Sequence, residues 1–427
     1  MAQQSVYLII AGGTGGHIVP GLGLALEFAA AGDPVHFLSL EKNRGYADFK
    51  DAPFPVHFYG APPIRKSPSA LLAFPFRFAR ALWRAAALMR KHRVSCVIGM
   101  GGYSIFPGVL AARLSGVPYY LCEQNAIPGR ATRLFAGGAR RIFLNFPVAA
   151  AHQSGAFAGE RALLAGNPLR PQLKAIAEEN RAASKKKGAG SARPGKKKSA
   201  AKSGARGRGK AKDGLTVLVL GGSQGAAQIN AMVAAAIPQL ASGSGNQAGA
   251  NSNPNSKTKT KTKSNAKKKS RAHTQTGPVA RWMIQCGEKN LDQMRALLPE
   301  NRFGNVTLFG YHPGIADFYR EADLLIARAG AGVVSEALVF GLPMILIPYP
   351  FAADNHQLGN AEYLRDGGVA HCISTRETDP AELIEVLRRW SADSTELMNR
   401  SSRALDLARP GAAAEIRASI VADLSKA

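Results

Sequence analysis

Two glycine-rich turns, each directly behind an apolar run, constrain the fold of this chain more than any other feature. The first turn, Gly12-Gly13-Thr14-Gly15-Gly16-His17, follows the run at 6–11. The second, Gly221-Gly222-Ser223-Gln224-Gly225, follows the run at 215–220. Each pattern predicts a buried strand, a tight turn and a helix N-terminus, where free backbone N–H groups and the positive helix end bind phosphate. The sequence therefore predicts two similar α/β domains that face one cleft.

The length and composition suit an enzyme of two domains. A chain of 427 residues is longer than one hydrophobic core usually supports, and 46% of its residues are apolar, as in folded proteins. The four cysteines are scattered without a Cys-x-x-Cys pair, which is typical of reduced thiols in the cytosol. The first apolar run is short and lacks a basic leader, and no run is long enough to cross a bilayer, so we expect neither a signal peptide nor a membrane span.

Most of the net charge of +26 lies in two segments of low complexity. Residues 181–213 carry thirteen Lys or Arg and one Asp, and residues 257–271 carry eight Lys or Arg and no acid. The stretches 182–213 and 241–278 hold almost no large apolar side chains, so they cannot bury enough surface to offset the entropy of ordering. We expect both stretches to be disordered insertions, and the rest of the chain to be moderately basic.

Apolar runs alternate with helical patterns in both halves, which is typical of parallel sheets covered by helices on both faces. Helical patterns in the first half lie at 22–31 and 108–114. The predicted strands are 6–11, 35–40, 94–99, 118–122 and 141–145, and then 215–220, 281–286, 305–309, 323–327, 343–348 and 369–373.

One segment, residues 70–93, interleaves arginines with leucine, phenylalanine and tryptophan. A basic helix with such an apolar face can lie on an anionic membrane. On pattern alone, a surface helix that buries its apolar stripe and keeps its arginines in water is favoured. Pro75 is expected to break the pattern near its start.

The first glycine turn ends on a histidine, and it departs from the dinucleotide-binding pattern because Ile18 stands where a third glycine is expected. An imidazole at the positive end of a helix tends to be neutral and can accept a proton, so His17 is a candidate general base. A histidine that only hydrogen-bonds the turn is the alternative, and it is the commoner outcome for an isolated motif.

Other small-residue turns and polar side chains also follow strands. Residues 99–104 and 123–126 lie at strand carboxyl ends, where open α/β sheets bind ligands. Residues 327–332 precede a helix that carries Glu336, which can accept hydrogen bonds from ribose hydroxyls or complement the helix dipole. A cluster of polar residues follows, and its side chains could bind sugar hydroxyls or simply cap a helix N-terminus. It comprises Asp354, Asn355, His356, Gln357 and Asn360.

Eight motifs occur in an order that resembles the MurG family of glycosyltransferases. They are AGGTGGHIVPGLGLA, GMGGYSIFPG, EQNAIPG, GNPLR, GGSQGAAQIN, ARAGAGVVSEAL, GLPMILIPYP and DNHQLGNA, and they cover nearly the whole chain apart from the basic segments. Members transfer N-acetylglucosamine (GlcNAc) from UDP-GlcNAc to lipid I, which is undecaprenyl-diphospho-MurNAc-pentapeptide, and so form lipid II. The resemblance implies the GT-B fold, an α/β fold of two Rossmann-like domains whose parallel sheets face a central cleft.

The resemblance also implies how the chain is divided. Residues 1–173 would form the acceptor domain that faces the membrane, and 174–213 a basic linker. Residues 214–408 would form the UDP-GlcNAc domain, interrupted by the insertion at 241–278. Residues 409–427 would form a C-terminal helix that packs back on the first domain.

The site residues that the resemblance implies fall on both sides of the cleft. His17 and Glu123 would be catalytic, and Gly13 and Tyr103 would lie on the acceptor side. The donor UDP-GlcNAc would be bound by Thr14, Gly15, Gly16, Asn125, Arg170, Ser223, Gln224, Glu336, His356, Gln357 and Asn360. Among these, Ser223 and Gln224 would hold the diphosphate, and Glu336 the ribose.

The chain departs from the family pattern at two positions: Ala329 stands where several members have serine, and His356 where many have the first of two glutamines. Inversion at the anomeric carbon needs one displacement and one base, and the chain holds no Asp-x-Asp motif, so we expect no metal or other cofactor in the chemistry. The membrane-borne acceptor that the resemblance implies favours 70–93 as a membrane-binding face, on the cytoplasmic side of the inner membrane.

Two other functions stay open from the sequence. A different enzyme of the same fold, such as a transferase to another acceptor or an epimerase, could use UDP-GlcNAc. The Lys-rich segments could bind nucleic acid with a steep salt dependence, but they lack interleaved aromatic residues, so no specific nucleic acid partner is expected.

Overall fold

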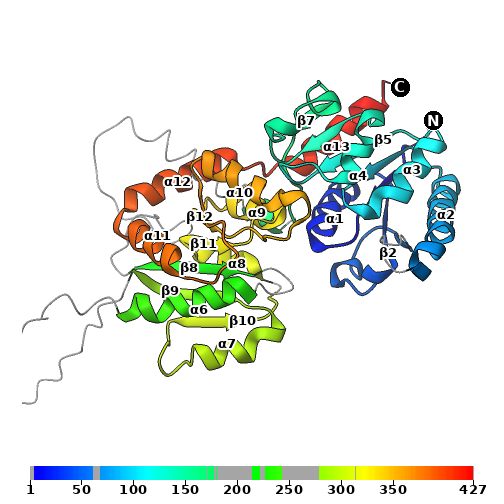
Figure 1. The fold of residues 1–427 in the computed structure, drawn as a ribbon. Coiled ribbons are helices and arrows are strands. Elements are labelled where there is room, and N and C mark those ends of the chain that lie inside the picture. Colours follow the sequence, from blue (N-terminus) through cyan, green and yellow to red (C-terminus); the bar gives the residue numbers. More distant parts are fainter. Residues whose placement is uncertain are drawn as a thin grey trace, which may run out of the picture.

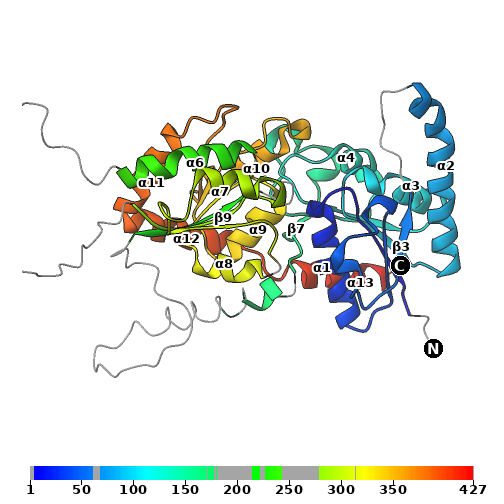
Figure 2. The same cartoon turned by 90° about the horizontal axis from the view of Figure 1, so that it is seen from below.

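The chain folds into two α/β domains that lie side by side, each built on one parallel sheet (Figure 1; Figure 2). The computed structural model describes residues 4–60, 68–170, 172–176, 179, 214–221, 227–242, 278–312 and 314–426. The predicted α/β class with two parallel sheets is confirmed.

The N-terminal sheet has seven parallel strands in the order β3-β2-β1-β4-β5-β6-β7. Leu8 and Ile10 of β1 face one hydrophobic cluster while Tyr7 and Ile9 face another, so this strand is buried on both sides, which explains its unbroken apolar run. The strands are β1 (Tyr7–Ile10), β2 (Val35–Leu40), β3 (Val56–Tyr59), β4 (Cys96–Gly99), β5 (Tyr119–Glu123), β6 (Ile142–Leu144) and β7 (Ala162–Leu164).

The helices of this domain cover both faces of its sheet (Figure 1). They are α1 (Gly15–Ala30), α2 (Pro68–Lys91), α3 (Phe106–Leu114) and α4 (Arg130–Phe135). The helix α2 runs through Pro75 without ending, so the predicted break is wrong. Pro75 is exposed in the first part of the helix, and proline is tolerated there with local adjustment of the backbone.

The C-terminal sheet has six parallel strands in the order β10-β9-β8-β11-β12-β13. Its strands are β8 (Leu215–Leu220), β9 (Val279–Gln285), β10 (Val306–Phe309), β11 (Leu324–Ala327), β12 (Met344–Leu346) and β13 (Ala370–Cys372). Its helices are α6 (Ala227–Ser242), α7 (Leu291–Leu297), α8 (Ile315–Glu321), α9 (Ala331–Val339), α10 (His356–Asp366), α11 (Ala381–Ala392) and α12 (Ser394–Leu407).

The last helix, α13 (Ala412–Leu424), returns to the N-terminal domain and packs against α1 (Figure 2). Ile416 and Ile420 join the hydrophobic cluster beneath α1, and Asp423 accepts a hydrogen bond of 2.7 Å from Tyr120. Arg417 pairs with Asp33 at 2.6 Å. The N-terminal domain therefore takes its fold from both ends of the chain.

The predicted insertions lie mostly outside the described residues, so their order is not addressed by the structure. Their margins differ from the predicted boundaries. Residues 241–242 end α6, and the stretch 172–176 is helical, with Leu173 and Ile176 buried between the domains. Within the described residues, no helix is both long and apolar enough to cross a bilayer.

Candidate active site

In each sheet the order of the strands changes direction beside the first strand of the domain. The carboxyl ends of the strands on either side of this point lie at the domain interface. In the N-terminal sheet the reversal lies between β1 and β4, and in the C-terminal sheet between β8 and β11. Ligands of open α/β sheets bind at such points. The helices that follow β1 and β11, α1 and α9, are in contact with each other.

His17 lies in the first turn of α1 against the backbone of the turn that follows β4. A Cβ atom added at Gly102 would lie 3.0 Å from Cε1 of His17, and one at Gly101 would lie 3.3 Å from Cδ2. Both glycines also have positive φ angles, so the close approach of the ring depends on glycine. Nδ1 of His17 lies 3.4 Å from Oγ1 of Thr14.

The His17 ring is held in its neutral form. Burial lowers its pKa to about 4, with a further contribution from the nearby His356 imidazole. His356 begins α10 in the other domain, and its Nδ1 lies 2.7 Å from the carbonyl oxygen of Ala353. The two histidines therefore bring the N-terminal and C-terminal parts of the predicted site together.

Glu123 is buried at the end of β5 and organises the loop that follows. One carboxylate oxygen accepts hydrogen bonds from the backbone and side-chain N–H groups of Asn125, at 3.1 and 3.3 Å. The other accepts from the N–H of Gly129 at 2.9 Å. Both oxygens are therefore engaged within the loop, and the catalytic role that the resemblance implies for Glu123 stays a prediction.

Asn360 of α10 joins this loop to the C-terminal domain. Its side-chain amide donates to Oδ1 of Asn125 at 3.1 Å and to the carbonyl of Ala329 at 3.0 Å, while its oxygen accepts from the N–H of Ala126 at 2.9 Å. The side chain is completely buried. One of its two donor hydrogens and its oxygen are thus used between the domains, and the second donor bonds within the C-terminal domain.

Glu336 lies at the interface on α9. Tyr319 donates a hydrogen bond of 3.0 Å to its Oε2. Burial raises the pKa of the Glu336 carboxyl, against the opposing effects of the Arg170 cation and the Tyr319 hydroxyl. Arg170, from the loop after β7, has a buried Nε atom with no hydrogen-bond partner in the part of the chain that is described.

Glu336 lies in the second turn of its helix. The helix begins at Ala331, and Glu336 is its sixth residue, so it does not complement the helix dipole. The helix start faces open space instead: a Cβ atom added at Gly330 or Gly332 would meet no described atom within 4 Å. Its first N–H groups have no side-chain cap among the described residues.

The remaining predicted residues occupy the same region. Tyr103 is 39% exposed, and its ring lies near the Lys42 ammonium and within 3.5 Å of the point where a Cβ of Gly13 would stand. Gln357 accepts a hydrogen bond of 2.9 Å from the backbone of Tyr349. Gly15 and Gly16 begin α1. Ser223 and Gln224, with the rest of the second glycine turn, lie outside the described residues.

Two interface features were not predicted. Gln124 is buried, and its Oε1 has no hydrogen-bond partner within the described chain. This atom lies 3.1 Å from the point where a Cβ atom of Gly101 would stand, and the His17 ring approaches the same point. Asp354 has a φ angle of 51° and forms exposed ion pairs with Arg130 and Arg133 of the other domain, at 3.1 and 3.0 Å. The motif that contains Gln124 was recognised, but nothing in it signalled this contact.

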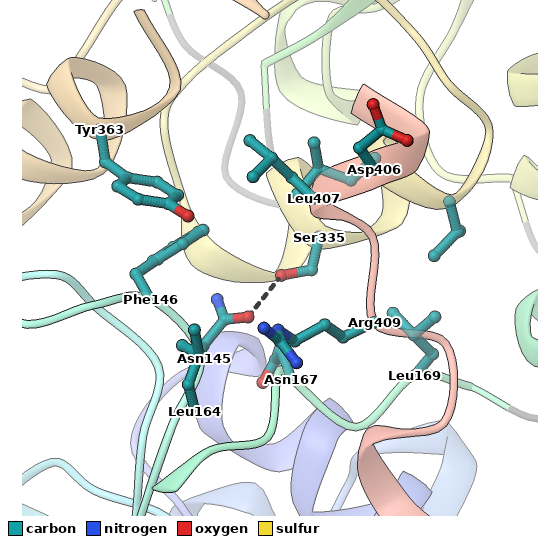
Figure 3. A pocket seen from close by; sticks show the side chains of 12 residues that line it. Asn145, Phe146, Leu164, Asn167, Leu169, Ser335, Tyr363, Asp406, Leu407 and Arg409 are labelled. Atoms are coloured by element: carbon teal, nitrogen blue, oxygen red, sulfur yellow. Dashed lines mark hydrogen bonds between the residues drawn. The ribbon is translucent and has the colours of Figure 1, made fainter. Parts of the chain in front are cut away.

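A cavity of about 60 Å³ also lies between the domains, where the chain crosses at 164–169 and 406–409 (Figure 3). Ser335 donates a hydrogen bond of 3.3 Å to Asn145 across it, joining α9 to the end of β6. This volume is large enough for water but too small for a nucleotide sugar, so the cavity is not the donor site.

Solved structures with this arrangement define the class of protein. The crystal structure of Acinetobacter baumannii MurG matches with a TM-score of 0.65 at 23% identity, covering 97% of this chain and 98% of that one. A UDP-GlcNAc 2-epimerase from Neisseria meningitidis, bound to UDP-GlcNAc, matches with a TM-score of 0.60 at 11% identity, covering 98% and 100%. The fold is therefore GT-B, the fold of two-domain glycosyltransferases, as predicted.

Sequence relatives narrow the class to one family. The N-terminal domain model of glycosyltransferase family 28 matches residues 7–144, and its C-terminal domain model matches residues 216–416. A Burkholderia multivorans protein is 31% identical over 97% of this chain and 95% of its own length. It is named UDP-N-acetylglucosamine–N-acetylmuramyl-(pentapeptide) pyrophosphoryl-undecaprenol N-acetylglucosamine transferase. A Shewanella piezotolerans protein of the same name is 30% identical over 95% and 94%. The chain belongs to glycosyltransferase family 28, within the MurG family, which confirms the resemblance and the enzyme class.

The environment of His17 predicts an unusual titration. In a protein labelled with ¹⁵N-histidine, we expect the His17 imidazole to titrate near pH 4 by NMR, because burial disfavours its charged form. His356→Gln should raise the His17 midpoint, since it removes one positive neighbour, whereas His152→Gln, on a surface turn, should leave it unchanged. A wild-type midpoint at the ordinary histidine value of about 6.5 would contradict this description of the site.

Proposed function

We propose that this enzyme transfers GlcNAc from UDP-GlcNAc to the C4 hydroxyl of MurNAc in undecaprenyl-diphospho-MurNAc-pentapeptide, converting lipid I into lipid II for peptidoglycan synthesis. The observation that carries this proposal is the relationship to transferases named for that reaction along 97% of the chain. The fold alone does not suffice, because a UDP-GlcNAc epimerase shares it.

The donor would lie on the C-terminal side of the interface. The Glu336 carboxylate, which accepts a hydrogen bond from Tyr319, would accept hydrogen bonds from both ribose hydroxyls. The open start of α9 at Gly330 offers uncapped N–H groups to the diphosphate. Such fixed donors also stabilise the negative charge that develops on UDP as it leaves. The second glycine turn would supply Ser223 and Gln224 to the same diphosphate.

The acceptor would approach from the N-terminal side, beside the first glycine turn and Tyr103. His17, kept neutral, would take the proton of the attacking C4 hydroxyl as the general base. The hydroxyl displaces UDP from the anomeric carbon in one step with inversion, so no sugar–enzyme bond forms. Glu123 acts through Asn125, whose backbone and side chain it holds near the sugar.

The helix α2 would hold the enzyme on the membrane that carries its acceptor. Leu72, Phe76 and Trp83 are spaced by four and seven residues, so they share one face, and they are 78%, 78% and 70% exposed. The opposite face, with Ala81 and Ala85, is buried on the domain. These three large apolar side chains are thus outside the buried face, on which Leu82, Leu88 and Met89 pack against the core.

The surroundings of this face suit an anionic surface. Arg77, Arg80 and Arg84 of α2 are exposed, and each basic residue near an anionic membrane contributes about 1 kcal/mol of binding free energy. The helix lies on the outer side of the N-terminal domain, away from the C-terminal domain (Figure 2). Since the donor is a cytoplasmic nucleotide sugar, we place the enzyme peripherally on the cytoplasmic face of the plasma membrane.

The reaction is tested by following UDP release from UDP-GlcNAc with and without a lipid I analogue, in the presence of EDTA. We expect release that requires the acceptor and survives the chelator. His17→Ala should lower kcat by about 10²- to 10⁴-fold, as expected for loss of a general base, with the KM for UDP-GlcNAc little changed. Release without acceptor, or transfer only to a different sugar, would favour the epimerase or another transferase instead.

The assignment of Glu336 predicts a defect in donor binding. Glu336→Gln removes the charge that accepts the ribose hydrogen bonds, so we expect the KM for UDP-GlcNAc to rise by about 10-fold or more. The control is Glu321→Gln, because Glu321 lies exposed on α8 in an ion pair with Arg281. Equal donor KM values in the Glu336 variant and the wild type would remove Glu336 from the ribose site.

The membrane face is tested by vesicle sedimentation. Replacing Leu72, Phe76 and Trp83 together by serine should lower binding to phosphatidylglycerol vesicles by about 10-fold or more, because apolar area no longer enters the bilayer. Leu297→Ser changes an exposed leucine on α7 of the other domain, and it should bind like the wild type. Unchanged binding of the triple variant would exclude α2 as the membrane contact.

A further inference from the structure

Three histidines from three separate elements meet at one edge of the N-terminal sheet. His36 lies on β2, His57 on the edge strand β3, and His92 directly after α2. One ring nitrogen of each lies within 4.8 Å of the other two. Nδ1 of His36 and Nε2 of His57 are 3.0 Å apart, and the ring of His92 lies 4.2 Å from that of His36, centroid to centroid. All three side chains are partly accessible.

The fold dictates this meeting. His57 pairs with Leu38 in the β2–β3 register, so its side chain lies on the same face of the sheet as those of Leu38 and His36. That face is covered by α2. After α2, Arg93 adopts a left-handed φ angle of 50°, and the N–H of Val94 bonds back to the carbonyl of Met89, which ends the helix and brings His92 to the sheet.

The electrostatics of the cluster favour neutral imidazoles. Burial, then His92 and His57, lower the pKa of His36 to about 4. Burial, His92 and the Lys91 ammonium lower the pKa of His57. Neutral imidazole with a free lone pair is the form of histidine that binds metals.

We propose that His36, His57 and His92 form a binding site for a divalent transition metal, with Zn²⁺ the best match. Three imidazole nitrogens and a water molecule complete a tetrahedral zinc shell. Ligand nitrogens at about 2.05 Å from zinc lie about 3.3 Å apart in that geometry, so the 3.0 Å hydrogen bond between His36 and His57 needs only a small adjustment.

The metal would link the end of α2 to β2 and β3. It would thereby hold α2, which carries the exposed Leu72, Phe76 and Trp83 side chains, in place on the sheet. This role is structural and separate from glycosyl transfer, for which the enzyme needs no metal under the function proposed above. Loss of metal binding would therefore leave acceptor-dependent UDP release by the solution assay in place.

The test uses the full-length protein without an affinity tag. We expect Co²⁺ to bind with one equivalent showing the intense visible absorption of tetrahedral cobalt, and Zn²⁺ to displace it. His57→Gln keeps a side chain of similar size but lacks the ligand, and we expect it to lower the Zn²⁺ affinity by about 100-fold or more. His152→Gln, which changes a partly exposed histidine elsewhere on the domain, should bind like the wild type.

A thermal melt gives the second readout. Zn²⁺ should raise the Tm of the wild type but not of His57→Gln or His92→Gln, and without metal all three should melt at similar temperatures. His92 lies outside the strands, so we expect its substitution to disturb the sheet less than that of His57. If the His57 variant does not fold, the His92 variant tests whether the cluster binds Zn²⁺. No binding at micromolar Zn²⁺, or equal affinity in the wild type and both variants, would overturn the proposal.

Discussion

The contact between the domains depends on the buried side chain of Asn360. Two of its hydrogen bonds join α10 to the loop at Asn125 and Ala126 of the other domain, and a third fixes its amide to the backbone of Ala329 in its own domain. An unpaired buried amide costs about 1–3 kcal/mol, so this side chain strongly favours the two domains staying in register. The loop at Asn125 and Ala126 is in turn held by Glu123, which accepts hydrogen bonds from the N–H groups of Asn125 and Gly129. Buried polar side chains therefore fix both the loop and its contact with α10.

This arrangement links substrate binding to the relative position of the domains. Asn360 donates one amide hydrogen to Asn125 of the other domain and the second to Ala329 of its own domain, so a sugar that takes the place of Asn125 on this amide replaces a domain contact. His17 and His356 influence each other electrostatically across the same interface, as do Arg170 and Glu336. Binding of the donor would thus replace hydrogen bonds between the domains by hydrogen bonds to the sugar. The N-terminal domain, which would bind the acceptor, could then change its position relative to the C-terminal domain.

The sequence predicted the buried strands well because they are continuous apolar runs; the predicted strands 35–40 and 215–220 coincide with β2 and β8. It missed β3 and β7, the two edge strands of the first sheet, whose short and half-buried sequences give no such run. The motifs indicated Asn125 and Asn360 as site residues, but no pattern can show that they bond to each other, because 235 residues separate them. The histidine cluster was not predicted for the same reason, because its three members lie far apart in the sequence and do not show the short spacing of a metal-binding motif.

The most direct measurement is a crystal structure of the full chain with UDP-GlcNAc. We predict that the ribose hydroxyls lie within hydrogen-bonding distance of the Glu336 carboxylate, with the diphosphate at the start of α9 and the anomeric carbon turned toward His17. A nucleotide held by the N-terminal domain, or a ribose away from Glu336 with the sugar remote from His17, would contradict this account of the site.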